Sequence, residues 1–431
     1  MVAARLLAAV VDKATALDAL TDQEHGHPQF LALEPRDRAL VRAILVTALR
    51  FHGTIAALIK ARLQRPLPAN ARTLDHILHV AAAQMLFLDV PDSAAVDLAV
   101  SHAGGDPRTA RFAALVNAVL RELGRRKERA LPAALAQNAD APDWFVERLT
   151  GAYGEERTAA ILAMHRREPP TDFTVKSDPA GWAEKFGGIV LENGSVRVAR
   201  LAAPVGEMPG YSEGEWWVQD MAASLPARLL GDVEGKRVLD LCAAPGGKTA
   251  QLAAAGAKVA AVDLSASRLK RLASNLDRLK LEAETVQSNA LAYAPAEPFD
   301  AVLLDAPCSS TGTVRRHPDV PWTKTPEDIA KLASLQRSLL DHAVTLVKPG
   351  GVVVFANCSL DPLEGEQLTA GFLADHPEIA IDPVDASEVP GTAAFVTSEG
   401  WLRTTPDALE TDPPELSGCD GFFAVRLVRQ G

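Results

Sequence analysis

Three of the four cysteines in this chain follow shortly after apolar runs, among residues that form turns. They are Cys242, Cys308 and Cys358. If these runs are parallel strands, their carboxyl ends meet at one edge of a sheet, and we expect the three thiols to converge on one cleft. A thiolate is a nucleophile, so the cluster predicts covalent chemistry. Each cysteine taken alone is as readily explained as a small buried apolar residue.

The stretch of residues 236–249 predicts the site that these thiols would face. Val238, Leu239 and Leu241 supply a near-continuous apolar run that is typical of a strand buried on both faces. A turn with Gly246 and Gly247 follows, and a helix is expected from Thr249. The glycines allow the backbone to approach a ligand closely, and the free N–H groups at the helix start lie just behind them.

Two interpretations of this turn remain open. Gly247, Lys248 and Thr249 match the end of a phosphate-binding P-loop, but that pattern requires glycine where the chain has Cys242. A nucleoside cofactor instead requires an acidic residue at the end of the next strand, where it holds the ribose hydroxyls. Asp263 follows the next apolar run and favours the nucleoside interpretation.

Composition limits the classes of protein to consider. The chain has 431 residues, enough for two or three domains, and its net charge of −11 argues against a general nucleic-acid binder. The charge balance is +3 in residues 1–140 and −14 in the remainder, so any contact with a polyanion must be local. Four cysteines without a close pair predict a cytoplasmic protein, and their spacing predicts no metal site. Since no apolar run reaches the roughly 18 residues of a membrane span, we expect no membrane contact.

Sequence periodicity predicts three domains. Residues 1–135 carry apolar stripes at helical spacing and predict an all-α domain, with an alanine-rich linker at 131–140. Residues 141–218 mix helical and short-strand patterns, which indicates a small α+β subdomain. In residues 219–431 strands and helices alternate, which predicts a Rossmann-like α/β domain with a parallel sheet. We place a late strand at 424–427 antiparallel at the edge of that sheet.

A thiol beside a methyl donor would solve a specific chemical problem. The C5 carbon of cytosine is a poor nucleophile, but addition of a thiolate to C6 makes C5 enamine-like, so that it can attack a methyl group. Such a site needs a thiolate, a second group that completes the elimination, and a carboxyl group that hydrogen-bonds the ring. A free thiol has a pKa of about 8.5, and Lys248 is a candidate cation to lower it.

Three motifs resemble those of the bacterial RNA 5-methylcytosine methyltransferases of the Sun/NOL1/NOP2 family. The motifs are Asp240-Leu241-Cys242-Ala243-Ala244-Pro245-Gly246-Gly247-Lys248-Thr249, Asp305-Ala306-Pro307-Cys308-Ser309 and Asn357-Cys358-Ser359. The helical N-terminal part resembles the NusB-type domain that begins the 16S rRNA branch of this family. Residues 314–319 and 420–423 also resemble that branch, so the resemblance covers nearly the whole chain.

The resemblance implies S-adenosylmethionine as the methyl donor. It implies that Cys358 is the nucleophile, that Cys308 assists product release, and that Lys248 and Asp305 lie near both cofactor and cytosine. The implied cofactor-binding residues are Cys242, Ala243, Ala244, Pro245, Gly246, Gly247, Lys248, Asp263, Arg268, Asn289 and Asp305.

From this resemblance we expect a cytoplasmic monomer that methylates cytosine C5 in RNA, with 16S rRNA as the substrate. Two alternatives remain: the same chemistry on tRNA, and a non-catalytic RNA-binding assembly factor. Two positions depart from the family pattern, because Asn289 stands where the family has aspartate and Asn357 where it has threonine. The Asn289 side chain can still hydrogen-bond an adenine amino group through its carbonyl oxygen.

Several residues outside the motifs have two interpretations each. Arg315, Arg316 and His317 would contact RNA phosphates or lie in a solvated loop. Trp322 would stack on a base or pack its own loop. The basic run at 125–129 would bind RNA or end a solvated helix.

Overall fold

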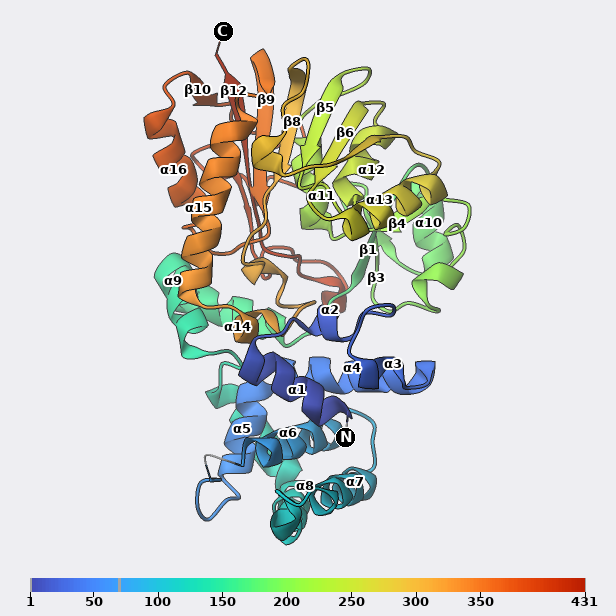
Figure 1. The fold of residues 1–431 in the computed structure, drawn as a ribbon, viewed down its shortest axis with the longest axis vertical. Coiled ribbons are helices and arrows are strands. Elements are labelled where there is room, and N and C mark those ends of the chain that lie inside the picture. The colour runs from blue at the N-terminus through green and yellow to red at the C-terminus, as the bar shows by residue number, and fades with distance from the viewer. Residues whose placement is uncertain (1, 69–70, 431) are drawn as a thin grey trace. The chain divides into compact units, whose positions relative to one another are not determined.

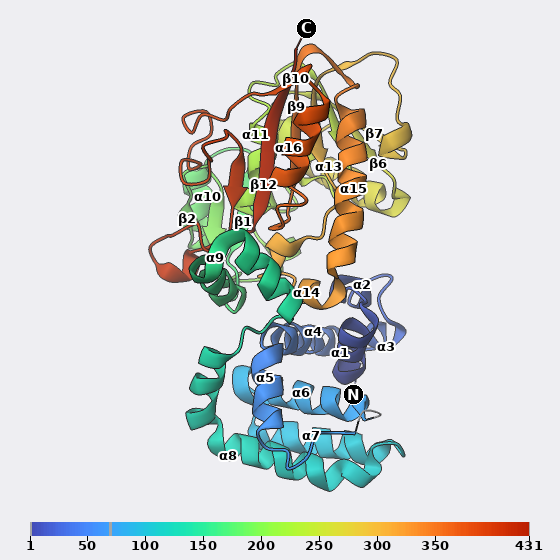
Figure 2. The same ribbon diagram turned by 90° about the vertical axis from the view of Figure 1, so that its left-hand side faces the viewer.

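The computed structural model describes residues 2–68 and 71–430, and the chain forms two compact units. The first comprises Met1–Arg166 with Arg316–Thr325, and the second comprises Arg167–Arg315 with Pro326–Gly431. Figures 1 and 2 show that the first unit is built of helices and the second around a large sheet. The three-domain division at residues 1–135, 141–218 and 219–431 stays a prediction.

Regular elements in the described part of the first unit are helical. They are α1 (Val2–Lys13), α2 (Leu17–Leu20), α3 (Pro28–Leu31), α4 (Pro35–Arg50), α5 (His52–Lys60), α6 (Arg72–Phe87), α7 (Asp92–Gly105), α8 (Ala113–Gln137), α9 (Asp143–His165) and α14 (Val320–Thr323). Their apolar faces share one core, in which Leu74 and Leu78 of α6 are fully buried. The segment predicted as a linker, residues 131–140, is helical as far as Gln137, because its alanines and leucines favour a helix.

The segment Arg316–Thr325 packs against the helices of the first unit, although the residues on both sides of it belong to the second. The Leu17 backbone N–H donates to Asp319 Oδ2 at 2.9 Å, and His317 pairs with Asp18 at 3.1 Å. The ring of Trp322 lies 4.2 Å from that of His52. Trp322 therefore packs against a neighbouring helix, whereas the second interpretation had it pack its own loop.

The second unit begins with a small antiparallel sheet in the order β2-β3-β1-β4. Its elements are β1 (Thr171–Val175), α10 (Pro179–Phe186), β2 (Ile189–Val190), β3 (Val196–Val198) and β4 (Trp216–Val218). Asp172 and Arg197 form an ion pair that is completely buried, with Arg197 Nε 2.6 Å from Asp172 Oδ1. Arg197 also donates to the carbonyl oxygens of Leu416 and Gly418, so the pair joins this sheet to a late loop of the same unit.

Most of the second unit surrounds an eight-stranded mixed sheet in the order β10-β12-β9-β8-β5-β6-β7, with β11 paired to β12. Its strands are β5 (Arg237–Leu241), β6 (Lys258–Asp263), β7 (Glu284–Gln287), β8 (Phe299–Asp305), β9 (Val347–Asn357), β10 (Ile379–Ile381), β11 (Leu402–Thr404) and β12 (Phe422–Arg429). Strands β5 to β9 run parallel, as predicted, and β12 runs antiparallel to β9.

The predicted position of the late strand was wrong. Strand β12 does not end the sheet, because β10 pairs with its other side. Phe423, Val425 and Leu427 of β12 are all fully buried, and they share a core with the helix residues Leu340 and Phe372. A short edge strand outside β12 supplies part of the missing backbone pairing.

Helices cover both faces of the parallel strands, which makes this a Rossmann-like sheet, as predicted (Figure 1). They are α11 (Met221–Arg228), α12 (Gly247–Ala254), α13 (Ala266–Leu279), α15 (Pro326–Ala343) and α16 (Glu366–Asp375). Consecutive residues of β5 belong to different hydrophobic cores, because Val238 packs on one face of the sheet and Leu239 packs on the other. Burial on both faces explains why the strands read as continuous apolar runs.

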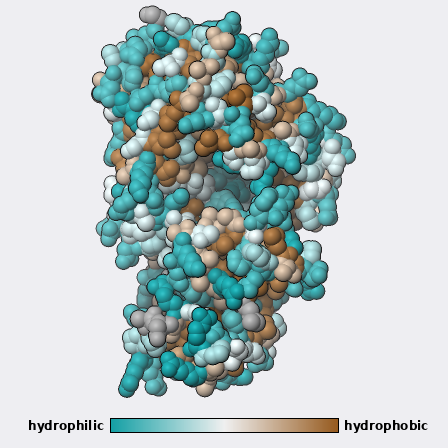
Figure 3. Space-filling model, viewed as in Figure 1, coloured by the Kyte–Doolittle hydropathy of each residue, from teal (hydrophilic) through white to brown (hydrophobic). Residues whose placement is uncertain are grey.

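Hydrophilic residues cover most of the face drawn in Figure 3, and hydrophobic residues occur there in separate patches. Within the described residues, no single helix has both the length and the apolar content to cross a bilayer. The bent pair of α4 and α5, whose axes differ by 76°, meets that criterion by length and composition.

Replacing Asp172 by alanine would leave Arg197 buried without its carboxylate. We expect this to lower the unfolding free energy of the second unit by about 3–5 kcal/mol, because an unpaired buried charge is strongly unfavourable. Urea unfolding followed by tryptophan fluorescence measures the change. Glu297→Ala is the control, since Glu297 pairs with Arg237 at the surface and exposed pairs contribute little. Equal effects of the two variants would contradict this role of the buried pair.

Candidate active site

The glycine-rich turn lies between β5 and α12 and is fixed by contacts within the second unit. Cys242 has a φ of 63° and Gly246 a φ of 100°, both in the left-handed region. A Cβ at Gly246 would lie 2.7 Å from Cγ of Leu272, so both the backbone and the packing require glycine there. Thr249 Oγ1 donates to Asp240 Oδ2 at 2.6 Å and ties the start of the helix to the strand.

Three carboxylates lie at the carboxyl ends of three neighbouring parallel strands. They are Asp240 in β5, Asp263 in β6 and Asp305 in β8. Burial, together with the nearby charges of Asp305 and Asp263, raises the pKa of Asp240 to about 7. Among the described residues, Asp240 Oδ1 has no hydrogen-bond partner. The negative charges of Asp263 and Asp305 at this edge are suited to a cationic ligand.

The carboxylate of Asp263 is almost fully buried and holds the turn. It accepts hydrogen bonds from the backbone N–H groups of Ala244 at 3.1 Å and Ser265 at 2.9 Å. Arg268 Nη1 lies 3.7 Å from Asp263 Oδ2, and the same guanidinium donates to the Ala244 carbonyl oxygen. Asn289 follows β7, and its side-chain oxygen accepts from the Leu291 N–H at 3.1 Å. The predicted cofactor residues thus lie in the turn and at the ends of the adjacent strands.

The thiols of Cys308 and Cys358 lie in contact, with their Sγ atoms 3.4 Å apart. Cys308 follows β8 and Cys358 follows β9, which pair in parallel with Asp305 opposite Ala356. Hydrogen bonding from the Cys308 thiol lowers the pKa of Cys358, and burial opposes this shift. The Cys358 sulfur and burial together raise the pKa of Cys308 well above its ordinary value. The arrangement therefore favours a Cys358 thiolate beside a Cys308 thiol.

Lys248 and Asp305 form an ion pair beside these thiols, with Lys248 Nζ 2.7 Å from Asp305 Oδ2. The Lys248 ammonium also lies 4.9 Å from the centre of the Phe422 ring. The pair influences Cys358 in opposite directions, because the Asp305 charge raises its pKa and the Lys248 charge lowers it. Lys248 lowers the pKa as predicted, but the larger cause is the hydrogen bond from Cys308.

One buried carboxylate in this region has no counterpart in the sequence analysis. Glu364 is fully buried and accepts hydrogen bonds from residues of both cysteine loops. An acidic residue in a loop is normally exposed, so the sequence gives no reason to place it in the interior. The one feature of the sequence that could have pointed to Glu364 is its position six residues after Cys358.

Other predicted residues have different surroundings. Within the described residues, no hydrogen bond joins Cys242 to Cys308 or Cys358, and burial raises the Cys242 pKa to about 12. Arg315 does not face solvent as a phosphate ligand would. Its side chain is buried, with Nη2 3.3 Å from Asp220 and 3.1 Å from Asp420. The prediction of a phosphate contact by Arg315 is therefore wrong, because its charge is engaged inside the fold.

In the basic run, Arg125 and Arg126 both pair with Glu122 on the surface of α8.

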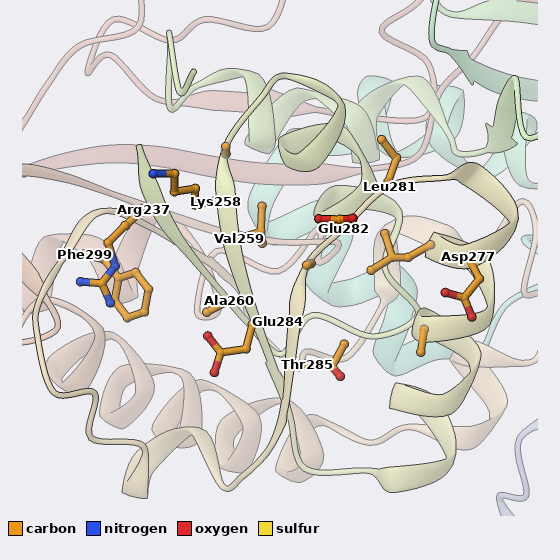
Figure 4. Close-up of a pocket in the computed structure, with 14 residues that line it drawn as sticks. Arg237, Lys258, Val259, Ala260, Asp277, Leu281, Glu282, Glu284, Thr285 and Phe299 are labelled. Atoms are coloured by element: carbon orange, nitrogen blue, oxygen red, sulfur yellow. The ribbon is translucent and has the colours of Figure 1, made fainter. Parts of the chain in front are cut away.

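A cavity of about 710 Å³ lies in the second unit, away from the cysteines (Figure 4). Arg237 and Lys258, which line it, begin β5 and β6, so it lies toward the opposite edge of the sheet from the cysteines. The described residues contain no group of three or more His, Cys, Asp or Glu side chains that could hold a metal ion.

Solved structures define the class of this fold. A crystal structure of a methyltransferase homolog protein from Pyrococcus horikoshii is 25% identical, with a TM-score of 0.55 over 66% of this chain and 94% of that one. The crystal structure of PH0851 covers 99% of both chains with a TM-score of 0.72 at 24% identity. The second unit is a Rossmann-like methyltransferase domain.

Sequence relatives identify the family. Residues 1–125 match the NusB family, and residues 227–428 match the family described as 16S rRNA methyltransferase RsmB/F. Ribosomal RNA small subunit methyltransferase B of Cronobacter sakazakii is 32% identical over 99% of this chain and 98% of its own length. The protein of that name from Klebsiella pneumoniae is 33% identical over 99% and 97%. The chain belongs to the RsmB/F family of RNA methyltransferases and carries a NusB-type helical domain, so the resemblance seen in the sequence is confirmed.

The unequal thiols predict selective alkylation of the free protein. At about pH 7.5, iodoacetamide should modify Cys358 well before Cys308, because only the thiolate reacts and the pKa of Cys358 is the lower one. Cys308 should become reactive only as the pH rises further. Peptide mass mapping over a pH series measures both rates. Faster labelling of Cys308 would reverse the assignment.

Proposed function

We propose that this chain transfers a methyl group from S-adenosylmethionine to C5 of a cytosine in RNA, with 16S rRNA as the substrate. The observation that carries the proposal is the pair of thiols 3.4 Å apart beside the Lys248–Asp305 ion pair. Both lie at the edge of the sheet where the glycine-rich turn begins. The choice of 16S rRNA rests on relatives named for the small subunit, which match nearly the whole chain.

The donor site is suited to a sulfonium compound because S-adenosylmethionine carries positive charge at its sulfur. Asp263 and Asp305 place negative charge at this edge, and Asp240 Oδ1 is a spare acceptor among the described residues. We assign donor binding to the turn at 242–248, with Arg268 supporting it. Each Asp263 oxygen has a second lone pair, so it can accept a ribose hydroxyl while it keeps its backbone bond.

Asn289 would take the adenine amino group through its side-chain oxygen. Asp305 would lie between the donor and the base. The bound donor would supply the methyl group that C5 takes, and it would leave as the neutral thioether S-adenosylhomocysteine.

The two cysteines would perform different parts of the reaction. The Cys358 thiolate adds to C6, so that its electron pair forms the S–C6 bond and C5 becomes nucleophilic. Asp305, held by Lys248, hydrogen-bonds the ring. After methylation the C5 proton passes to water, the C5=C6 double bond re-forms and the S–C6 bond breaks. The Cys308 thiol donates a hydrogen bond to the departing thiolate and thereby assists release.

Substitution of either cysteine should separate these roles. Cys358→Ala should neither methylate RNA nor form an adduct, while it still binds S-adenosylmethionine in calorimetry. Cys308→Ala should accumulate a covalent enzyme–RNA adduct, because the S–C6 bond still forms but the leaving sulfur lacks its donor. Denaturing gels with labelled RNA measure the adduct. Methylation by Cys358→Ala, or a clean gel for Cys308→Ala, would refute the assignments.

Loss of the protein should remove 5-methylcytosine from the small-subunit rRNA. Bisulfite sequencing of total RNA from cells with and without the gene tests this, since 5-methylcytosine resists deamination. Return of the wild-type gene should restore the signal, and return of the Cys358→Ala gene should not. A signal lost from tRNA while 16S rRNA stays unchanged would show that the substrate is wrong and the chemistry right.

A further inference from the structure

Glu364 lies in the loop between β9 and α16 and is fully buried. Its Oε1 accepts from the Ser309 backbone N–H at 2.9 Å and from Gln336 Nε2 at 2.8 Å. Its Oε2 accepts from the hydroxyls of Ser309 and Ser359, both at 2.5 Å. Four hydrogen bonds fill the acceptor sites of an ionised carboxylate.

These bonds join two loops that are distant in the sequence. Ser309 follows Cys308 directly and Ser359 follows Cys358, so one carboxylate binds the neighbour of each thiol. Hydroxyl bonds to a charged oxygen are short and about twice as strong as neutral ones. The Gly312 N–H, which donates to the Cys358 carbonyl oxygen at 2.9 Å, adds a further bond between the loops.

Asn357 strengthens the same connection. Its side-chain nitrogen donates to the Glu364 carbonyl oxygen at 2.7 Å and to Gln336 Oε1 at 3.1 Å. Its side-chain oxygen accepts from the Ser359 N–H at 3.0 Å. The asparagine that departs from the family pattern therefore holds the loop after β9 in place.

We propose that Glu364 is a positioning residue that couples the two cysteine loops and makes their thiols unequal, so that Cys308 remains the hydrogen-bond donor and Cys358 becomes the thiolate. The inference rests on the proposed roles of the two cysteines. It adds a residue that touches neither RNA nor the methyl donor and acts through the sulfur atoms.

The charges around the thiols support this asymmetry. The ionisable groups that act on Cys308 are Cys358 and Glu364, and both raise its pKa, whereas a hydrogen bond from the Ser310 backbone lowers it. The charges that act on Cys358 are Asp305 and Lys248, which are paired with each other and act in opposite directions. Glu364 therefore disfavours the thiolate at one sulfur, and the proton shared by the pair stays on Cys308.

Two variants separate charge from geometry. Glu364→Gln keeps the size and hydrogen bonding of the side chain, because the serine hydroxyls can turn to accept, but it removes the charge. Glu364→Asp keeps the charge and shortens the side chain by one methylene group. Glu388→Gln is the control, since Glu388 is a glutamate of the second unit that pairs with Arg426 and lies outside both loops.

The first readout is alkylation of the free protein, which requires no RNA. For Glu364→Gln we expect the preference of iodoacetamide for Cys358 over Cys308 to fall by about threefold to tenfold, which corresponds to a pKa change of up to one unit. Glu364→Asp and Glu388→Gln should keep the wild-type preference. Unchanged selectivity in Glu364→Gln would overturn the charge role.

The second readout is the kinetics of RNA methylation. Both Glu364 variants should lower kcat with little change in the KM for RNA, because the loops no longer hold the sulfur atoms in register. If Glu364→Gln does not fold, Ser359→Ala removes one bond to Oε2 with the charge retained, and it should lower kcat at wild-type selectivity. A wild-type kcat in Glu364→Asp and Ser359→Ala would overturn the coupling role. If wild-type protein does not methylate RNA, the proposed function fails, and the alkylation selectivity of Glu364→Gln still decides whether Glu364 makes the two thiols unequal.

Discussion

The contact between two sulfur atoms is the interaction on which the rest of the site depends. A thiol and a thiolate at hydrogen-bonding distance share one proton, so their surroundings decide which sulfur is the nucleophile. The parallel register of β8 and β9 brings the two cysteines side by side, since both strands end at the same level. Buried side chains behind them join the two loops, and the surroundings raise the pKa of Cys308 and lower that of Cys358.

Much of the fold could be predicted from the sequence because the parallel strands are buried on both faces and therefore appear as apolar runs. The convergence of Cys308 and Cys358 followed from the same rule about strand ends. The burial of Glu364 and Arg315 could not be predicted, because their main partners are distant in the sequence and a single charged residue is normally expected to be exposed. The position of β12 was missed for a similar reason, since the short strand β10 has no distinctive pattern.

Acidic and basic side chains have different locations in the second unit. Its carboxylates gather at the strand ends, where they suit a cationic donor but would repel a phosphate backbone. Two of its arginines, Arg197 and Arg315, are committed to buried carboxylates and contribute nothing to a basic surface. The excess of negative charge after residue 140 is thus compatible with an RNA enzyme only if basic contacts are confined to small areas.

The segment Arg316–Thr325 makes the chain pass between the two units three times rather than once. A single cut after residue 166 would therefore not yield two complete pieces. The helical piece would lose Asp319, which accepts from the Leu17 N–H, and Trp322, which packs against His52. The other piece would carry the segment Arg316–Thr325, which starts eight residues after Cys308, without the helices against which it packs. The helical unit is thus completed by ten residues from the later part of the chain, and residue 166 does not divide the chain into two self-contained pieces.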